Sequence, residues 1–158
     1  MASHVSSRVL GVGAALALFC SGCPSASPAP RAPVYQGPVY AELVLENRLS
    51  GNFVLTEASF AFEGDARPVD LPAPGQSVSL GSVTTQGGEH PIALRAVLRG
   101  EGSGVFSYLR AYKFEVRAKP KVLLDAPQVR VLCAIRTHEE PTMPLEQRPY
   151  ADCAASPL

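Results

Sequence analysis

The 158-residue chain carries 14 Lys and Arg against 14 Asp and Glu, so its formal net charge at pH 7 is zero. This balance argues against the basic surface with which proteins neutralise nucleic-acid phosphates, and we expect no nucleic-acid partner. Trp is absent, whereas 13 Gly and 15 Pro are spread along the chain. Such a composition is typical of a secreted all-β module with many turns.

The N-terminus has the three-part layout of a secretory signal peptide. A polar stretch with one positive charge at Arg8 precedes an apolar run over 9–19, and small residues stand directly before Cys23. The apolar run is shorter than the roughly 20 residues that a bilayer-spanning helix requires. The sequence therefore predicts a leader over 1–22, after whose removal 13 Lys and Arg remain against 14 Asp and Glu.

The small residues before Cys23 resemble those of the bacterial lipoprotein signal, whose cysteine receives a diacylglycerol before cleavage makes it the new N-terminus. The resemblance implies that Cys23 is lipidated and anchors the protein to a membrane. One position departs from the family pattern, because Cys20 stands where Leu, Val or Ile is usual. Cys20 is itself a poor candidate for lipidation, since the bulky Leu18 and Phe19 precede it. An ordinary secretory signal cut nearby is the alternative.

A tract rich in Pro, Ala and Ser follows the cysteine. Its prolines forbid helix, and its other residues offer little apolar surface to bury. We expect residues 23–38 to be a disordered, extended linker, with a reach of up to roughly 45 Å where it is polyproline-like. Pro24 stands where many inner-membrane lipoproteins carry Asp, and by that resemblance we expect the outer membrane.

Residues 39–158 have the length of one domain. Period-two alternation predicts strands, most clearly over 90–99, where apolar residues face one side and arginines the other. The glycine-rich run 99–104 predicts a hairpin turn. We therefore expect an all-β fold, a single antiparallel β-sandwich of about seven strands. The predicted strands cover residues 39–46, 53–62, 77–83, 90–99, 105–117, 121–124 and 128–136.

Part of this domain resembles a family of envelope proteins from myxobacteria and related bacteria that has no established function. The resemblance rests on the run Gly87–Ala118 and on the sequence LEQRPY at Leu145–Tyr150. The start of the first run also resembles transthyretin-like sandwich modules. These resemblances imply a sandwich in an envelope setting and transfer no catalytic residue.

The predicted strand 105–117 carries a series of aromatic residues of one parity, with Arg110 among them. Alternation favours the interpretation that this parity faces the core, because the opposite parity is polar. In the other interpretation the rings are exposed, so that Tyr108 and Tyr112 stack on sugars and Arg110 pairs with a ligand carboxylate. A core-facing Arg110 would need an acidic partner. The candidates for that partner are Glu42, Glu46 and Asp125.

Two cysteines remain in the predicted domain. Cys133 shares parity with the apolar residues of the last predicted strand, and Cys153 lies in a proline-rich tail that we expect to be irregular. In an oxidising envelope compartment an isolated pair predicts a structural disulfide that fastens the tail to the sandwich.

Catalytic and metal-binding motifs are not apparent. The run around Ser103 is not GxSxG, and adjacent Glu89 and His90 would point to opposite faces of a strand. A zinc site drawn from the two cysteines, His138 and Asp152 lacks the usual ligand spacing. We therefore expect no metal, no cofactor and no catalytic residue.

These expectations favour a lipid-anchored envelope protein that acts as a non-catalytic binding, accessory or scaffold module, with an envelope protein or a glycan as its partner. The exposed edge strands of a sandwich would allow a partner to bind by strand addition. The alternatives are a carbohydrate-binding module and an uncharacterised envelope hydrolase.

Overall fold

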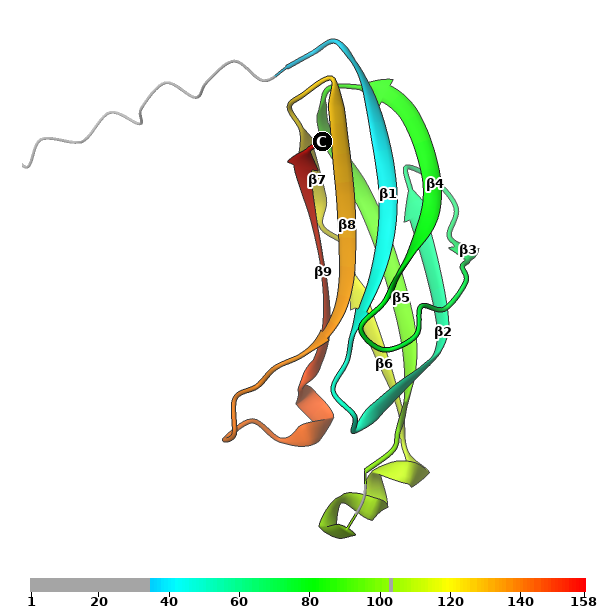
Figure 1. Ribbon diagram of the computed structural model, residues 1–158, viewed down its shortest axis with the longest axis vertical. Coiled ribbons are helices and arrows are strands. Elements are labelled where there is room, and N and C mark those ends of the chain that lie inside the picture. The colour runs from blue at the N-terminus through cyan, green and yellow to red at the C-terminus, as the bar shows by residue number, and fades with distance from the viewer. Residues whose placement is uncertain (1–34, 103) are drawn as a thin grey trace, which may run out of the picture. The chain divides into compact units, whose positions relative to one another are not determined.

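The computed structural model describes residues 35–102 and 104–158, which form two β-sheets packed face to face (Figure 1). The expectation of an all-β sandwich is confirmed, although the described residues form nine strands instead of about seven. No helix in this part of the chain has the length and apolar character that a membrane crossing needs. The predicted leader, Cys23, most of the linker and Ser103 lie outside the described residues.

The elements are β1 (Pro38–Arg48), β2 (Phe53–Phe62), β3 (Arg67–Pro68), β4 (Ser77–Gln86), β5 (Gly88–Gly100), the 3-10 helix η1 (Gly104–Ala111), β6 (Lys113–Ala118), β7 (Lys121–Leu124), β8 (Gln128–Thr137), the 3-10 helix η2 (Leu145–Gln147) and β9 (Pro149–Pro157).

One sheet has the strand order β4-β1-β8-β9, and the other has the order β3-β2-β5-β6, with β7 paired to the start of β5. The pair β1–β8 is parallel, so the expectation of wholly antiparallel sheets is wrong at this point. Parallel neighbours need a long crossover connection, and here most of the domain lies between the two strands. No local sequence pattern in either strand predicts that the two strands pair.

The core lies between the two sheets and follows the predicted alternation. In β1 the side chains of Ala41, Leu43 and Leu45 are at most 1% exposed, while their polar neighbours face outward. In β5 every second residue from Ile92 to Leu98 is at most 2% exposed. Burial of this apolar surface is the main driving force for packing the sheets together.

The segment 105–117, predicted as one strand, is in fact η1 followed by the short strand β6. Gly100 and Gly102 allow this, because a Cβ on either one would lie 2.3 Å from the carbonyl oxygen of Leu109 or Phe106, respectively. The glycine-rich run is thus a place of close backbone approach, where η1 folds back against the end of β5. The prediction of a tight hairpin turn is wrong, although β5 and β6 are still antiparallel neighbours.

The C-terminal tail, predicted to be irregular, forms the edge strand β9, which pairs antiparallel with β8. Cys133 and Cys153 stand directly opposite each other in this ladder and form the predicted disulfide, with a Cα–Cα distance of 4.0 Å. Cys133 faces the core and is fully buried. The disulfide therefore joins two neighbouring strands of one sheet instead of holding a loose tail.

Candidate binding site

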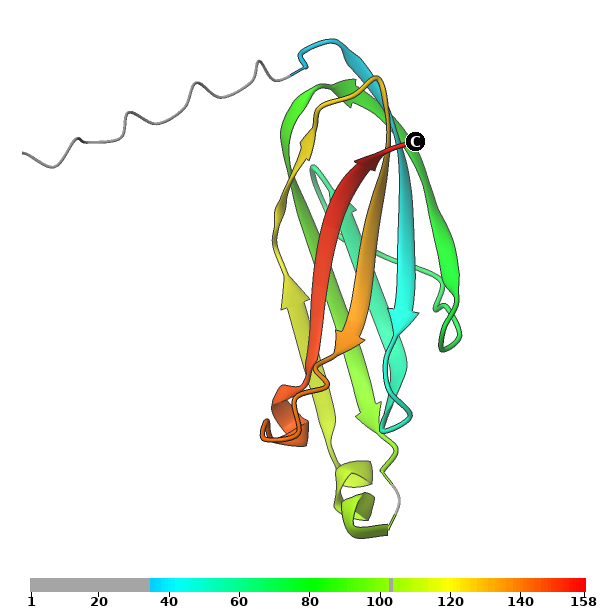
Figure 2. The ribbon, with the colours of Figure 1, turned by 60° about the vertical axis from the view of Figure 1, so that its left-hand side comes forward.

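The short helix η1 lies at one end of the domain (Figures 1 and 2). This end exposes a cluster of large apolar side chains, which we call the aromatic tip. The exposed fractions are 84% for Val105, 42% for Phe106, 46% for Tyr108 and 54% for Tyr112. These four are half of the eight large hydrophobic residues that are exposed in the described part of the chain. The prediction that the aromatic series faces the core is therefore wrong for the tip.

A continuous series of aromatic contacts connects the tip to the core. The ring of Phe53, which is buried, lies 5.4 Å from that of Phe114, centroid to centroid. The Phe114 ring lies 6.4 Å from that of Tyr112, which lies 6.4 Å from that of Tyr108. All three distances fall in the range of favourable aromatic pairs. Together with the fully buried Leu109, these contacts position η1 on the body of the sandwich.

A second loop supports the tip through the Tyr108 hydroxyl. That hydroxyl donates a hydrogen bond to the Glu146 carboxylate in η2, with an O–O distance of 2.9 Å. The hydrogen bond, followed by burial and the nearby negative charge, raises the pKa of Tyr108 above its ordinary value of 10.0. The phenol is therefore neutral at physiological pH and able to donate. The buried Leu145 attaches η2 to the domain beside it.

Arg110 is exposed on η1 and has no ion pair or side-chain hydrogen bond among the described residues. The predicted acidic partners are wrong, because η1 places Arg110 on the surface instead of in the core. The Glu42 carboxylate instead pairs with Arg130 at 2.9 Å, and Glu46 pairs with Arg48 at 2.7 Å. Arg110 is thus available for a ligand, as the exposed interpretation requires.

The spacing of the residues around the tip is compatible with two local structures. Phe106, Leu109 and Tyr112 recur every three residues, which is the period of a 3-10 helix. The same residues also fit a strand with one irregularity. The flanking glycines fit both a turn and a place where two backbone segments approach closely. Local pattern alone therefore does not separate the two structures.

The histidines of the described residues occupy structural positions. His90 is 7% exposed, with Nδ1 2.5 Å from the Glu63 carboxylate and Nε2 2.7 Å from the Gln86 carbonyl oxygen. The expectation that Glu89 points to the opposite face is confirmed, since its carboxylate lies outside, 3.6 Å from the Lys121 ammonium.

His138 stacks on Tyr150 with ring centroids 4.0 Å apart. Within the described residues no three His, Cys, Asp or Glu side chains come together in a metal-binding group. The two cysteines that a zinc site with His138 and Asp152 would need are joined to each other as a disulfide. The arrangement that remains is a surface suited to binding: half-exposed aromatic rings, one exposed guanidinium and a positioned phenol hydroxyl.

Comparison of the chain with protein-family models, with curated proteins and with solved structures finds no match.

Proposed function

We propose that this protein is a lipid-anchored, non-catalytic binding module of the bacterial envelope. In this proposal Cys23 carries the lipid, the linker 23–38 spaces the domain from the outer membrane, and the aromatic tip contacts the partner. Two lines of support come from different parts of the chain. The signal-like N-terminus supports the anchor, and the exposed rings of the tip support binding.

The observation that carries the proposal is the position of the tip within the domain. The chain enters the sandwich at Tyr35, which lies against Gly87 at the start of β5. The tip lies beyond the other end of β5, at Gly100. Thirteen residues of strand span about 40 Å at a rise of roughly 3.3 Å each. A lipid at the N-terminal side would leave the tip at the end of the domain farthest from the point of attachment (Figure 1).

A protein partner fits the composition of the tip. Tyr, Phe and Arg are enriched at the centres of protein interfaces, where a few such residues supply most of the binding energy. The rings are also held by aromatic contacts and by Glu146, so that little conformational freedom is lost on binding. This supports an accessory or scaffold role next to another envelope protein.

A glycan is the second candidate partner. The Tyr108 and Tyr112 rings are each about half exposed and lie beside each other, so their faces are available for stacking on sugar rings. Arg110 on the same helix would pair with an acidic sugar.

Site-specific photo-cross-linking in cells tests the proposal. A photoreactive amino acid replaces Tyr108 in the full-length protein, and a matched protein carries it at Tyr40, whose exposed fraction is the same 46%. We expect one envelope protein to be cross-linked from position 108 and not from position 40, and to be lost in the Cys23→Ala variant. Identical products from both positions would contradict a binding role for the tip.

Retention on insoluble envelope glycans separates the second candidate from the first. If the partner is a glycan, Tyr112→Ala should weaken retention by at least about tenfold, since a central aromatic contact is commonly worth more than 1 kcal/mol. Tyr40→Ala should leave retention unchanged. Intact mass of the purified protein tests the anchor independently: we expect a chain that begins at Cys23 and carries a diacylglycerol.

A further inference from the structure

The outer edge of β4 differs from the other sheet edges. Among the described residues, the edge strands β9 and β3 contain prolines, and β6 carries three charged residues, whereas β4 has neither over its ten residues. Charges and prolines are the usual devices that keep an exposed strand from pairing with another chain. The edge of β4 lacks both. Its one irregularity is the extra residue Leu80, where the register with β1 shifts, and from Gly81 to Gln86 the pairing with β1 is continuous, so this part of the edge is competent for pairing.

The backbone of β4 offers free hydrogen-bonding groups on this edge. The N–H of Gly87 donates to the Gly37 carbonyl at 2.8 Å, which makes these two a hydrogen-bonded pair at the start of the β1–β4 ladder. Such pairs alternate with non-hydrogen-bonded pairs, so the register places Val83 in the first class and Ser82 and Thr84 in the second. The N–H and C=O groups of Ser82 and Thr84 therefore point away from β1, where the described residues provide no further strand.

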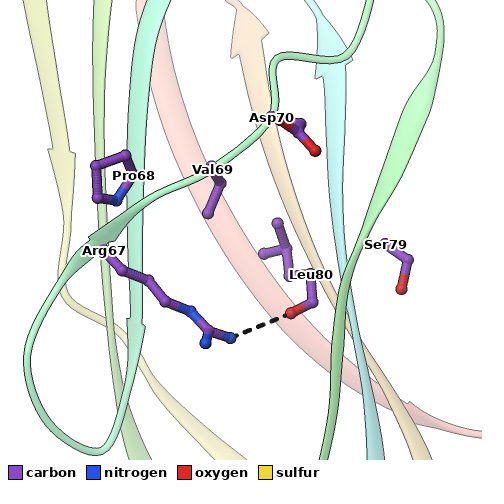
Figure 3. Close-up of a pocket in the computed structure, with 6 residues that line it drawn as sticks. All are labelled: Arg67, Pro68, Val69, Asp70, Ser79 and Leu80. Carbon is purple, nitrogen blue, oxygen red and sulfur yellow. Dashed lines mark hydrogen bonds between the residues drawn. The ribbon is translucent and has the colours of Figure 1, made fainter.

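Side chains cap the edge on both sides of this stretch. The Arg67 guanidinium donates to the Leu80 carbonyl at 3.3 Å, as Figure 3 shows. His90 Nε2 donates to the Gln86 carbonyl at 2.7 Å. Between the two capped carbonyls lies an open stretch of strand, residues 81–85, which we call the β4 window. An added strand would find its backbone partners there.

A pocket of about 230 Å³ opens between the two sheets beside the β4 window. Leu43 and Phe60, both almost fully buried, contribute to its lining. Val83 from β4 and Phe62 from β2 line it as well and are only partly buried. Side chains of a strand alternate between the two faces, so an added strand would direct every second side chain toward this pocket. The buried inner lining favours an apolar side chain there, whereas the more exposed rim is polar.

The rim of the pocket carries more negative than positive charge. Glu63 and Asp65 supply two carboxylates, and the one guanidinium, that of Arg67, is turned toward the Leu80 carbonyl. Glu63 has a φ of 48°, a conformation uncommon for a residue other than glycine, and its carboxylate is held by His90. Glu63 is thus already paired, whereas Asp65 has no ion pair or side-chain hydrogen bond among the described residues. Its carboxylate favours a partner segment with a basic residue next to its apolar ones.

We propose that the β4 window and its pocket bind an extended segment of a partner protein, which adds to β4 as a new edge strand and places alternate apolar side chains between the sheets. The recognition mode is strand addition, in which backbone hydrogen bonds supply affinity and side-chain pockets supply specificity. This surface is distinct from the aromatic tip, so either proposal can fail alone.

The probe is a labelled synthetic peptide in which valine alternates with threonine between terminal lysines. It is titrated against the full-length mature protein carrying Cys23→Ala. We expect saturable binding with a Kd below about 1 mM, which corresponds to roughly 4 kcal/mol. The matched peptide, N-methylated at its threonines, cannot donate to the strand edge and should bind at least tenfold more weakly, a difference of about 1.4 kcal/mol. Equal binding of the two peptides, or no binding of the first, overturns the proposal.

Residue-resolved amide exchange locates the peptide. In the free protein we expect fast exchange at Ser82 and Thr84 and slow exchange at Val83, whose N–H bonds to β1. Peptide should slow exchange at Ser82 and Thr84 by at least about tenfold and leave Val83 unchanged. Binding without this alternating protection places the peptide elsewhere and overturns the proposal.

Two variants at one position separate backbone from side-chain effects. Thr84→Pro removes the outward N–H and should abolish binding, whereas Thr84→Val keeps that N–H and should bind as the wild type does. Thermal unfolding of both variants reports whether each is folded. If the proline variant does not fold, the N-methylated peptide still decides the question.

The same exchange measurement distinguishes other occupants of the edge. Protection of Ser82 and Thr84 that grows with protein concentration in the absence of peptide would mean that a second copy of the chain pairs with β4. Protection that is independent of concentration and lost on deletion of residues 24–34 would mean that the chain's own proline-rich tract lies there. Either result would overturn the proposal of a partner protein and would assign the edge of β4 to that occupant.

Discussion

The two flanks of the sandwich are built in different ways. On one flank β9 and β6 contact each other across the gap between the sheets, and the disulfide fastens β9 to β8; we call this the closed flank (Figure 2). On the other flank β3 and β4 are the edge strands, and pockets lined by both separate them; we call this the open flank (Figure 3).

Burial also differs between the central strand β8 and β4, the edge strand of the open flank. Val131 and Ile135 of β8, beside the closed flank, are at most 1% exposed. Val78, Leu80 and Val83 of β4 face the same core and are only partly buried. Unfilled apolar surface contributes little to stability and remains available for a ligand. The inward side chains of β9, the edge strand of the closed flank, are also only partly buried. The flanks therefore differ in the disulfide and the β6–β9 contact on one side and in the pockets on the other.

Removal of the disulfide should produce the largest effect on the closed flank. The two cysteines are 20 residues apart, and the chain-entropy model assigns about 3 kcal/mol to closing such a loop. We expect Cys153→Ser to lower the free energy of unfolding by that amount and Tm by on the order of 10 °C, measured without reductant.

Reduction of the wild type provides the control for this variant, because it breaks the same bond without a substitution. Thiol titration should find no free cysteine in the native mature domain and one in the variant. If variant and wild type melt together, or if the native wild type shows both thiols, the closed flank does not depend on a covalent link.

A pair of equal substitutions compares the central strand β8 with the edge strand β4. Val131→Ala should cost about 2 kcal/mol, because the change removes two buried methylene equivalents of about 0.8 kcal/mol each and leaves a cavity. Val83→Ala should cost less than about 1 kcal/mol, since much of its side chain is already in contact with solvent. Denaturant unfolding of both variants at one pH checks the difference. Equal costs would mean that the open flank is covered in solution.

The sequence predicted the alternation of the core strands and the disulfide of the closed flank. The alternation of β1 and β5 follows from a sheet with one buried face, and it identified Leu43, Leu45 and Ile92 as core residues. The pairing of Cys133 with Cys153 followed from their number and from the expectation of an oxidising compartment.

The features that distinguish the two ends and flanks depend on long-range contacts. The parallel pairing of β1 with β8 joins segments at opposite ends of the domain sequence. The exposure of Tyr108 depends on whether Gly100 forms a turn or admits the backbone of Leu109, and the local sequence permits both. Residues 149–157 form the strand β9 because they pair with the free edge of β8, although β9 has a proline at each end. Tertiary context decided each of these cases.

The smallest predicted effect concerns an ion-pair cluster on β6, the edge of the second sheet at the closed flank. Hydrogen bonds from Arg95 and Arg117, together with their charges, lower the pKa of Glu115 from 4.5 to about 2. Because the folded pKa is the lower one, this carboxylate contributes stability above about pH 4.5, and the contribution is lost as pH falls toward 2. The cluster is exposed to solvent, so screening keeps the contribution small.

Unfolding midpoints of Glu115→Gln and wild type should therefore differ slightly at pH 6 and converge as the pH approaches 2. Glu101→Gln serves as the matched control, because its carboxylate lies 3.8 Å from a single guanidinium, that of Arg99. A larger effect at Glu115 than at Glu101, reduced by added salt, would assign the difference to the doubly paired carboxylate. Equal effects at the two positions would mean that this cluster stabilises the closed flank no more than an ordinary surface ion pair does. The stability of the closed flank would then rest on the disulfide and on packing.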